Sequence, residues 1–131
     1  EAIADFDDSF VYYLLFTIKA YNLHNPPLSS DVPKIEIYIE DEIYNAEIVK
    51  GNIIVKRGAI EGEDVSITSS KEEAVNMIKS KSYVTDSFKA EKFTIELKAE
   101  KSILFAKGYL NFYTEITGES ITGNVIRFYT S

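Results

Sequence analysis

The stretch from residue 46 to residue 79 constrains the fold most strongly, because it combines short alternating segments with a capped helix. Residues 43–49 and 53–57 are predicted strands, separated by the tight turn Lys50-Gly51-Asn52. Residues 64–69 (DVSITS) alternate again and predict another strand, which runs directly into a helix. This order of elements predicts an α+β fold.

The helix after residue 69 carries a start signal and a stop signal. Ser70 lies three residues before Glu73, which is the spacing of a capping box, and Ser69 with Glu72 offers a second register. Lysines gather at the other end, where they favour the negative end of the helix dipole. We therefore predict that the helix ends near Lys81.

The preceding segments predict a helix, a loop and a strand. Apolar residues recur at helical spacing over residues 8–23, although the many β-branched and aromatic residues there would also suit a strand. Residues 24–33 form a Pro-rich loop. Residues 35–40 (IEIYIE) alternate as a half-buried strand does.

The later segments predict a further strand and a closing helix. Residues 82–91 are expected to form a loop or an irregular helix, and residues 93–98 a fifth strand. Residues 101–113 have a helical period, but Gly108 lies inside it at a helix cost of about 1 kcal/mol. The predicted stripe comprises Ile103, Leu104, Lys107, Leu110 and Tyr113 or Thr114.

The length and charge of the chain limit its class. A chain of 131 residues is expected to form one domain. The predicted parts are an N-terminal helix at about 8–23, a sheet with helices at about 34–116, and a tail at 117–131 that forms a last strand or a docking segment. The net charge of −7 marks an acidic protein and opposes binding to nucleic acid or to anionic lipid surfaces.

No pattern in the sequence predicts a catalytic, metal or cofactor site. Without Cys, disulfides, thiolate metal sites and Cys nucleophiles are excluded. The sole His, His24, lies in the Pro-rich loop and is expected to be solvated. The acidic clusters lack the spacing of a calcium loop, and the glycines do not form a phosphate-binding loop. We therefore expect no enzyme and no cofactor.

The compartment is left open by the sequence. The chain begins at Glu1 rather than Met, so we expect that a segment has been removed or lies upstream. The longest apolar run, residues 10–16, is far shorter than the roughly 20 residues of a membrane span. We expect a soluble chain, either cytoplasmic or the soluble part of a membrane-anchored protein.

The order of the predicted elements resembles the sterol carrier protein type 2 family. Gly51-Asn52 turns the hairpin into NIIVKRG, and EDVSITSSKEEAVNMI is similar to the family's acidic, alternating strand that runs into a helix. Phe88 resembles the aromatic residue that precedes the family's last strand, here FTIELK. The resemblance covers about residues 8–116.

The chain also departs from this family. Ala90-Glu91 and Ala99-Glu100 stand where the family usually has a Gly on each side of the last strand. The Pro-rich loop and residues 117–131 have no clear counterpart.

The resemblance implies a five-stranded, mainly antiparallel, twisted sheet covered by helices on one face. It also implies an apolar tunnel between sheet and helices, which holds a fatty acyl chain, a sterol or a similar lipid and exchanges it at membranes without covalent chemistry. By position, the candidate walls are Phe10, Leu14, Ile18, Met77, Ile78, Phe88, Phe93, Ile103, Leu104 and Phe105. For each of these residues, ordinary core packing is the alternative and the more frequent case.

Two alternatives to lipid binding remain open. The same fold could have a filled core and bind a protein partner, with the strand at 35–40 or the Tyr-rich tail adding to the partner by edge pairing. The chain could also be the soluble part of a surface protein. Its 9 Tyr and 8 Phe fit either a core of large rings or a roomy pocket.

Overall fold

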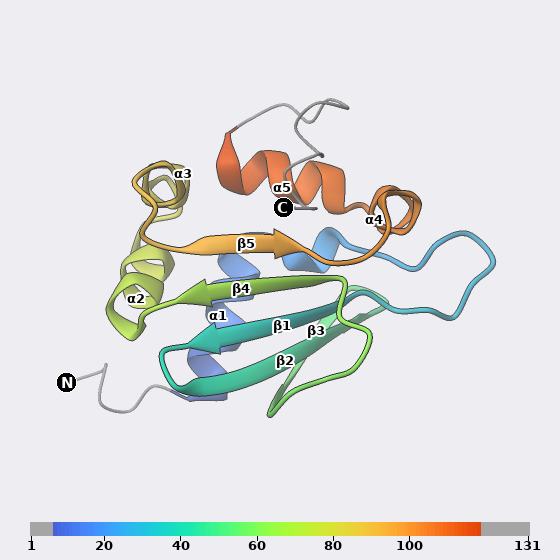
Figure 1. Ribbon diagram of the computed structural model, residues 1–131, viewed down its shortest axis with the longest axis horizontal. Helices are drawn as coiled ribbons and strands as arrows, with labels where there is room; N and C mark the ends of the chain where they lie inside the picture. The colour runs from blue at the N-terminus through green and yellow to red at the C-terminus, as the bar shows by residue number, and fades with distance from the viewer. Residues whose placement is uncertain (1–6, 119–131) are drawn as a thin grey trace.

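The computed structural model describes residues 7–118, which form a five-stranded sheet with helices packed around it (Figure 1). The strands are ordered β3 (Asn52–Arg57), β2 (Glu42–Val49), β1 (Lys34–Ile39), β4 (Val65–Ser69) and β5 (Thr94–Leu97). Neighbouring strands are antiparallel except β1 and β4, which are parallel. The prediction of an α+β fold with a mainly antiparallel, five-stranded sheet is confirmed.

β1 lies at the centre of the sheet. Ile37 pairs with Tyr44 of β2 on one side and with Ile67 of β4 on the other. The idea that the strand at 35–40 adds to a partner by edge pairing is therefore wrong, because both of its edges are already hydrogen-bonded. The edges of the described sheet are β3 and β5.

The alternation in the strands separates an apolar face from a polar face. Ile35, Ile37 and Ile39 are fully buried on the apolar face. The opposite face carries Glu36 and Asn45, which are covered by the loop at 58–63. The Ile60 amide donates to Glu36 Oε2 at 3.0 Å, and Asn45 Nδ2 donates to the Gly58 carbonyl at 2.9 Å. This loop therefore satisfies polar groups that it also buries.

Helix α1 (Asp8–Thr17) crosses behind the sheet in Figure 1 and buries Val11, Leu14 and Leu15. The predicted helix at 8–23 is too long. The α-helix ends at Thr17 because Lys19 adopts a left-handed conformation with φ of 64°. A short 3₁₀ helix, η2 (Ala20–Asn22), follows.

Helix α2 (Lys71–Lys79) begins as predicted, since the Ser70 side chain accepts a hydrogen bond from the Glu73 amide at 3.1 Å. It ends two residues before the predicted Lys81. The buried Glu73 carboxylate accepts a hydrogen bond from Ser87 Oγ at 2.5 Å. Ser87 lies in α3 (Tyr83–Lys89), so this bond ties the two helices together.

The predicted helix at 101–113 is two helices, α4 (Lys101–Lys107) and α5 (Tyr109–Thr117). Gly108 separates them because its φ of 90° cannot continue an α-helix and favours glycine. The tail predicted from residue 117 onward lies, from residue 119, outside the described residues.

A buried lysine anchors the junction between α4 and α5. The Lys107 side chain is 1% exposed, and its Nζ lies 3.0 Å from Asp64 Oδ2 and 3.1 Å from Asp31 Oδ2. It also donates to the Val32 carbonyl at 3.1 Å. The same ammonium therefore joins α4 to the start of β4 and to the Pro-rich loop.

The first residue of α5 extends this network. The Tyr109 hydroxyl donates to Asp64 Oδ2 at 3.1 Å, and the Lys34 amide donates to the same oxygen at 2.8 Å. Burial and the neighbouring Asp64 carboxylate raise the pKa of Tyr109 well above its usual value. The N-terminal end of α5 is thus fixed to the central strands through Asp64.

Candidate ligand-binding site

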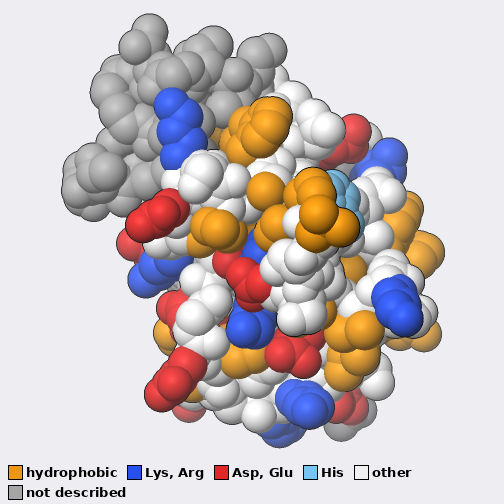
Figure 2. Space-filling model, turned by 90° about the vertical axis from the view of Figure 1, so that its right-hand side faces the viewer, with side chains coloured by type: hydrophobic (Ala, Val, Ile, Leu, Met, Phe, Trp, Pro, Cys, Tyr) orange, Lys and Arg blue, Asp and Glu red, His pale blue; other side chains and the backbone are white. Residues whose placement is uncertain are grey.

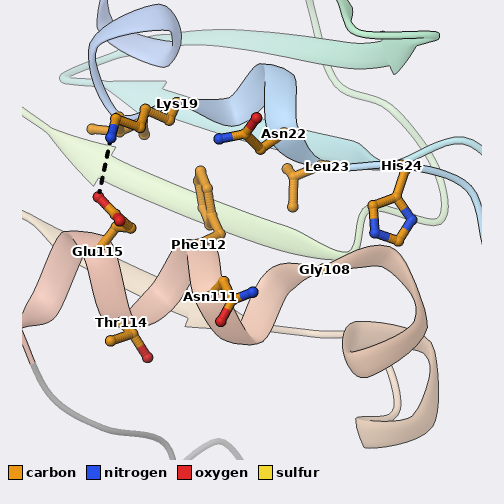
Figure 3. A pocket seen from close by; sticks show the side chains of 10 residues that line it. Lys19, Asn22, Leu23, His24, Gly108, Asn111, Phe112, Thr114 and Glu115 are labelled. Carbon is orange, nitrogen blue, oxygen red and sulfur yellow. Dashed lines mark ion pairs between the residues drawn. The ribbon is translucent and has the colours of Figure 1, made fainter.

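A cleft of about 350 Å³ lies between α5 and the turn that joins α1 to η2 (Figure 3). Its floor consists of Ile18, Leu23 and Phe112, whose side chains are 7%, 2% and 5% exposed. All three belong to the hydrophobic core. In Figure 3, the Phe112 ring points from α5 toward the turn, so the apolar floor of the cleft is the surface of the core itself.

The rim of this cleft is polar. Asn22 and Asn111 lie on opposite sides of it, from η2 and from α5. Gly108 and His24 lie at one end, where a Cβ at position 108 would stand 3.2 Å from His24 Nε2. Gly108 therefore gives this end of the cleft its width, in addition to the turn between the two helices.

Charged side chains stand at the other end. Lys19 Nζ lies 3.8 Å from Glu115 Oε1, as the dashed line in Figure 3 marks. The interaction with the neighbouring Lys19 lowers the pKa of Lys81, because two positive charges at short range disfavour each other. A neighbouring notch of about 20 Å³ is lined by both Lys81 and Glu115. The α1–η2 turn, the turn before residue 83 and α5 thus bring two ammonium groups near one carboxylate.

The structure places the ten predicted wall residues at different depths. Leu14, Ile18, Met77, Phe93 and Leu104 are buried, Phe10, Ile78, Phe88 and Ile103 are half-buried, and Phe105 is 70% exposed. Ile18 is the one that also lines the cleft below α5. Leu14, Met77 and Leu104 lie in the same core as the floor residues. The continuous tunnel remains a prediction.

Phe88 and Phe93 come together elsewhere. Their ring centroids are 5.7 Å apart. They line a separate cleft of about 410 Å³ beside β5, together with residues such as Glu91 and Thr94. Phe93 belongs to the main core and Phe88 packs against it, so these two rings lie where the core borders this second cleft.

Leu23 and Phe112 were not among the residues predicted for the site. A signal for Phe112 is present, because Tyr109, Phe112, Tyr113 and Ile116 recur at helical spacing and are all buried in α5. Reading residues 101–113 as a single helix obscured this spacing. Leu23 has no comparable signal, since its burial depends on the turn at Lys19.

The outer side of α1 forms another groove, of about 460 Å³. It is lined by the rings of Tyr12, Phe16 and Tyr21 and by the hairpin turn at residues 51–53. The Tyr12 and Phe16 ring centroids are 6.2 Å apart and the rings are nearly parallel. Tyr13 and Phe16 are 55% and 51% exposed, so a broad aromatic surface faces solvent here.

Within residues 7–118, no group of three or more His, Cys, Asp and Glu side chains could hold a metal ion. None of the helices in this part of the chain has the length and hydrophobicity that a membrane crossing requires. On the face drawn in Figure 2, basic and acidic side chains are interspersed with apolar ones. This face therefore shows no extended basic area of the kind that binds nucleic acid.

Neither a search with models of known protein families nor a search of curated proteins finds a match. Solved structures do match. The palmitated SCP2L2 of Aedes aegypti is 18% identical with a TM-score of 0.45, over 75% of this chain and 92% of that one. Sterol carrier protein 2 of Yarrowia lipolytica, in its apo form, is 14% identical with a TM-score of 0.40, over 86% and 83%.

A similar region also occurs in a much larger enzyme. The sec-alkylsulfatase Pisa1 of Pseudomonas sp. is 11% identical with a TM-score of 0.44, over 82% of this chain but only 14% of that chain. Proteins of the sterol carrier type are thus among the solved structures to which this chain is similar, as its sequence predicted.

Proposed function

We propose that this chain is a non-enzymatic protein that binds and transfers an apolar small molecule of the lipid type, in the cleft between α5 and the α1–η2 turn. One observation carries the proposal. The floor of the cleft is made of the core residues Ile18, Leu23 and Phe112, while its rim carries the polar Asn22 and Asn111. An apolar floor with a few polar groups at the rim is the usual composition of a small-molecule site.

The physical basis of binding would be the burial of apolar ligand surface. Each methylene that leaves water contributes about 0.8 kcal/mol, so a chain of several methylenes can bind without any charge contact. The predicted walls Leu14, Met77 and Leu104 lie in the same core as the floor. We propose that they form the inner wall that a longer ligand reaches.

α5 would act as a movable wall of this site. Gly108 and Gly118 flank it and both adopt left-handed conformations, with φ of 90° and 74°. A helix bounded by two glycines can change its tilt through a few backbone angles. The Lys107 network would keep its first residue in place during this movement.

Native mass spectrometry of gently purified protein, repeated after denaturation, tests the proposal. We expect a bound species with the mass of a lipid that is lost on denaturation, and a thermal shift with added fatty acids or sterols. The substitution Asn111→Trp should fill the cleft from its exposed rim and abolish the shift. Lys101→Trp, on the exposed surface of α4, is the matched control. A clean apo mass without any thermal shift would contradict lipid binding.

A second candidate function is binding of a protein partner through α1. Its inner face is buried, yet Tyr13 and Phe16 on its outer side are about half exposed. A helix that is apolar on all sides is usually covered on all sides. The double substitution Tyr13→Ser with Phe16→Ser should then abolish partner binding and leave lipid binding unchanged. Loss of lipid binding in that variant would argue against a separate partner surface.

A further inference from the structure

Lys19 occupies a backbone position that glycine normally takes. It follows the C-cap residue of α1, Ile18, and its φ of 64° lies in the left-handed region. This position after a helix is most often glycine, because a side chain there meets the backbone unfavourably. Backbone strain of this kind is concentrated at functional sites. A role for the Lys19 ammonium beyond the fold would account for a lysine here.

The surroundings of that ammonium are short of negative charge. The charged side chains that line the notch and the adjoining end of the cleft are Lys19, Lys81 and Glu115. The distance of 3.8 Å between Lys19 and Glu115 exceeds that of a hydrogen bond, and Glu115 is 52% exposed. Two cations therefore share one loosely held carboxylate, although the protein as a whole carries a charge of −7.

This cluster adjoins the apolar floor of the cleft. Ile18 lines both the cleft and the notch, and it precedes Lys19 in the chain. Phe112 lies one helical turn before Glu115 on α5, so the Phe112 ring and the Glu115 carboxylate both face the cleft. A ligand whose apolar tail lies on the floor would present its polar end to Lys19 and Lys81.

We propose that the cleft selects amphiphiles with an anionic head group, a carboxylate or a phosphate monoester, over neutral ones of the same chain length. Lys19 and Lys81 bind the head group, and the Glu115 carboxylate is the group that it displaces. Charge-assisted hydrogen bonds from two lysines supply the selectivity. This inference rests on the function proposed above.

Isothermal titration with decanoate, decyl phosphate and decanol, each below its micelle concentration, tests the head-group selectivity at constant tail length. We expect both anions to bind at least about tenfold more tightly than decanol, which corresponds to one hydrogen bond to a charged group. The ratio between the two anions shows which head group is preferred. Lys19→Met with Lys81→Met should lower the affinity for both anions to that for decanol.

Three further variants separate this role from a structural one. Lys56→Met removes an exposed lysine of β3 and should change no affinity. Glu115→Gln removes the competing carboxylate and should strengthen anion binding several-fold. Lys19→Gly relieves the left-handed strain, so it should raise Tm while it weakens anion binding. A change of stability and affinity in opposite directions is not expected of a residue that only supports the fold.

The outcomes are distinct. If decanoate, decyl phosphate and decanol bind equally well, the head-group selectivity is overturned and the apolar binding function stands. If the lysine variants weaken decanol as much as the anions, the lysines act through packing and the inference is overturned. If none of the three ligands binds, both the selectivity and the proposed function are overturned.

Discussion

α5 is tied to the rest of the protein by lysine–carboxylate pairs of two very different kinds. Just before its N-terminus, Lys107 is 1% exposed and contacts Asp64 and Asp31 at 3.0 and 3.1 Å. Near its C-terminus, Glu115 faces Lys19 at 3.8 Å, and these side chains are 52% and 35% exposed. Lys107 and Asp64 are both buried, at 1% and 4% exposed, whereas Glu115 and Lys19 remain in contact with water.

The buried pair therefore supports the fold, whereas the exposed pair is suited to ligand recognition. Breaking a buried pair leaves an uncompensated charge in the interior, at a cost of about 3–5 kcal/mol. An exposed pair contributes about 0–1 kcal/mol, because water and salt screen it. The Lys107 end of α5 therefore cannot exchange partners without unfolding. The Glu115 end can exchange its partner for a ligand at little cost.

Lys107→Ala should cause the largest loss of stability, because it removes the buried lysine next to the N-terminus of α5. The Asp64 carboxylate would lose its ammonium partner while it stays buried, so we expect a loss of about 3–5 kcal/mol in the free energy of unfolding. Urea denaturation followed by circular dichroism measures this loss. Lys98→Ala, which removes an exposed pair with Glu96 at 3.6 Å, is the control. Equal effects of the two substitutions would show that the Lys107 network is not structural.

Tyr109→Phe removes only the phenolic hydroxyl from the same end. The hydroxyl donates to the Asp64 carboxylate at 3.1 Å, and a bond to a charged group contributes about 1.5–3 kcal/mol. We expect a destabilisation in this range, measured by the same denaturation. Tyr13→Phe removes a hydroxyl from an exposed ring and should change stability by less than about 0.5 kcal/mol. If the stability of Tyr109→Phe is unchanged, Lys107 alone holds the Asp64 carboxylate in place.

High pH should destabilise the N-terminal end of α5, where the Tyr109 hydroxyl donates a hydrogen bond to Asp64. The pKa of Tyr109 is raised above the unfolded value of about 10, so the unfolded state releases this proton at lower pH. The resulting stabilisation is complete below about pH 10 and is lost as the pH rises further, by up to about 1.4 kcal/mol per pH unit. Burial also raises the pKa of Tyr44, to about 12, in the same window.

The pH effect is measured by urea denaturation at a series of alkaline pH values. The Tyr109→Phe variant should show a smaller slope than the wild type, because it retains only the other buried tyrosines. An identical slope in the two proteins would mean that Tyr109 titrates normally in the folded state.

Glu115→Ala should have the smallest effect. Its ion pair with Lys19 is long and exposed, so we expect a change of at most about 1 kcal/mol in the free energy of unfolding. The change should shrink further in high salt, because screening acts on exposed charges. A loss comparable to that of Lys107→Ala would remove the distinction between the two ends of α5.

The sheet and the α2 cap were predictable from local sequence. The alternation of Ile35, Ile37 and Ile39 determines which face is buried, and the Ser70 cap depends on residues three positions apart. Period and capping are local properties, so they can be recognised without knowledge of the tertiary structure. The strand order was not predicted, since the strand at 35–40 was expected to offer a free edge and instead lies at the centre of the sheet.

The ends of the helices and the site were not predictable in the same way. Gly108 was recognised as unfavourable within a helix, but its left-handed φ depends on how α5 packs. Lys107 was placed on the apolar stripe, and its partner Asp64 lies 43 positions away in the sequence. The cleft depends on the turn at Lys19, and no glycine or proline in the sequence there marks the end of α1. Each of these features is set by contacts between distant segments.

The central position of β1 also has a kinetic consequence. β1, β2 and β3 are joined by tight turns, so their pairing closes only short loops. The parallel partner β4 pairs with β1 at a separation of 30 residues, for example Ile35 with Val65, and loop closure of this length is slower. We expect the three-stranded meander to form first during folding. The part of the sheet that contains β4 and β5 then assembles last. The cleft between α5 and the α1–η2 turn forms together with it.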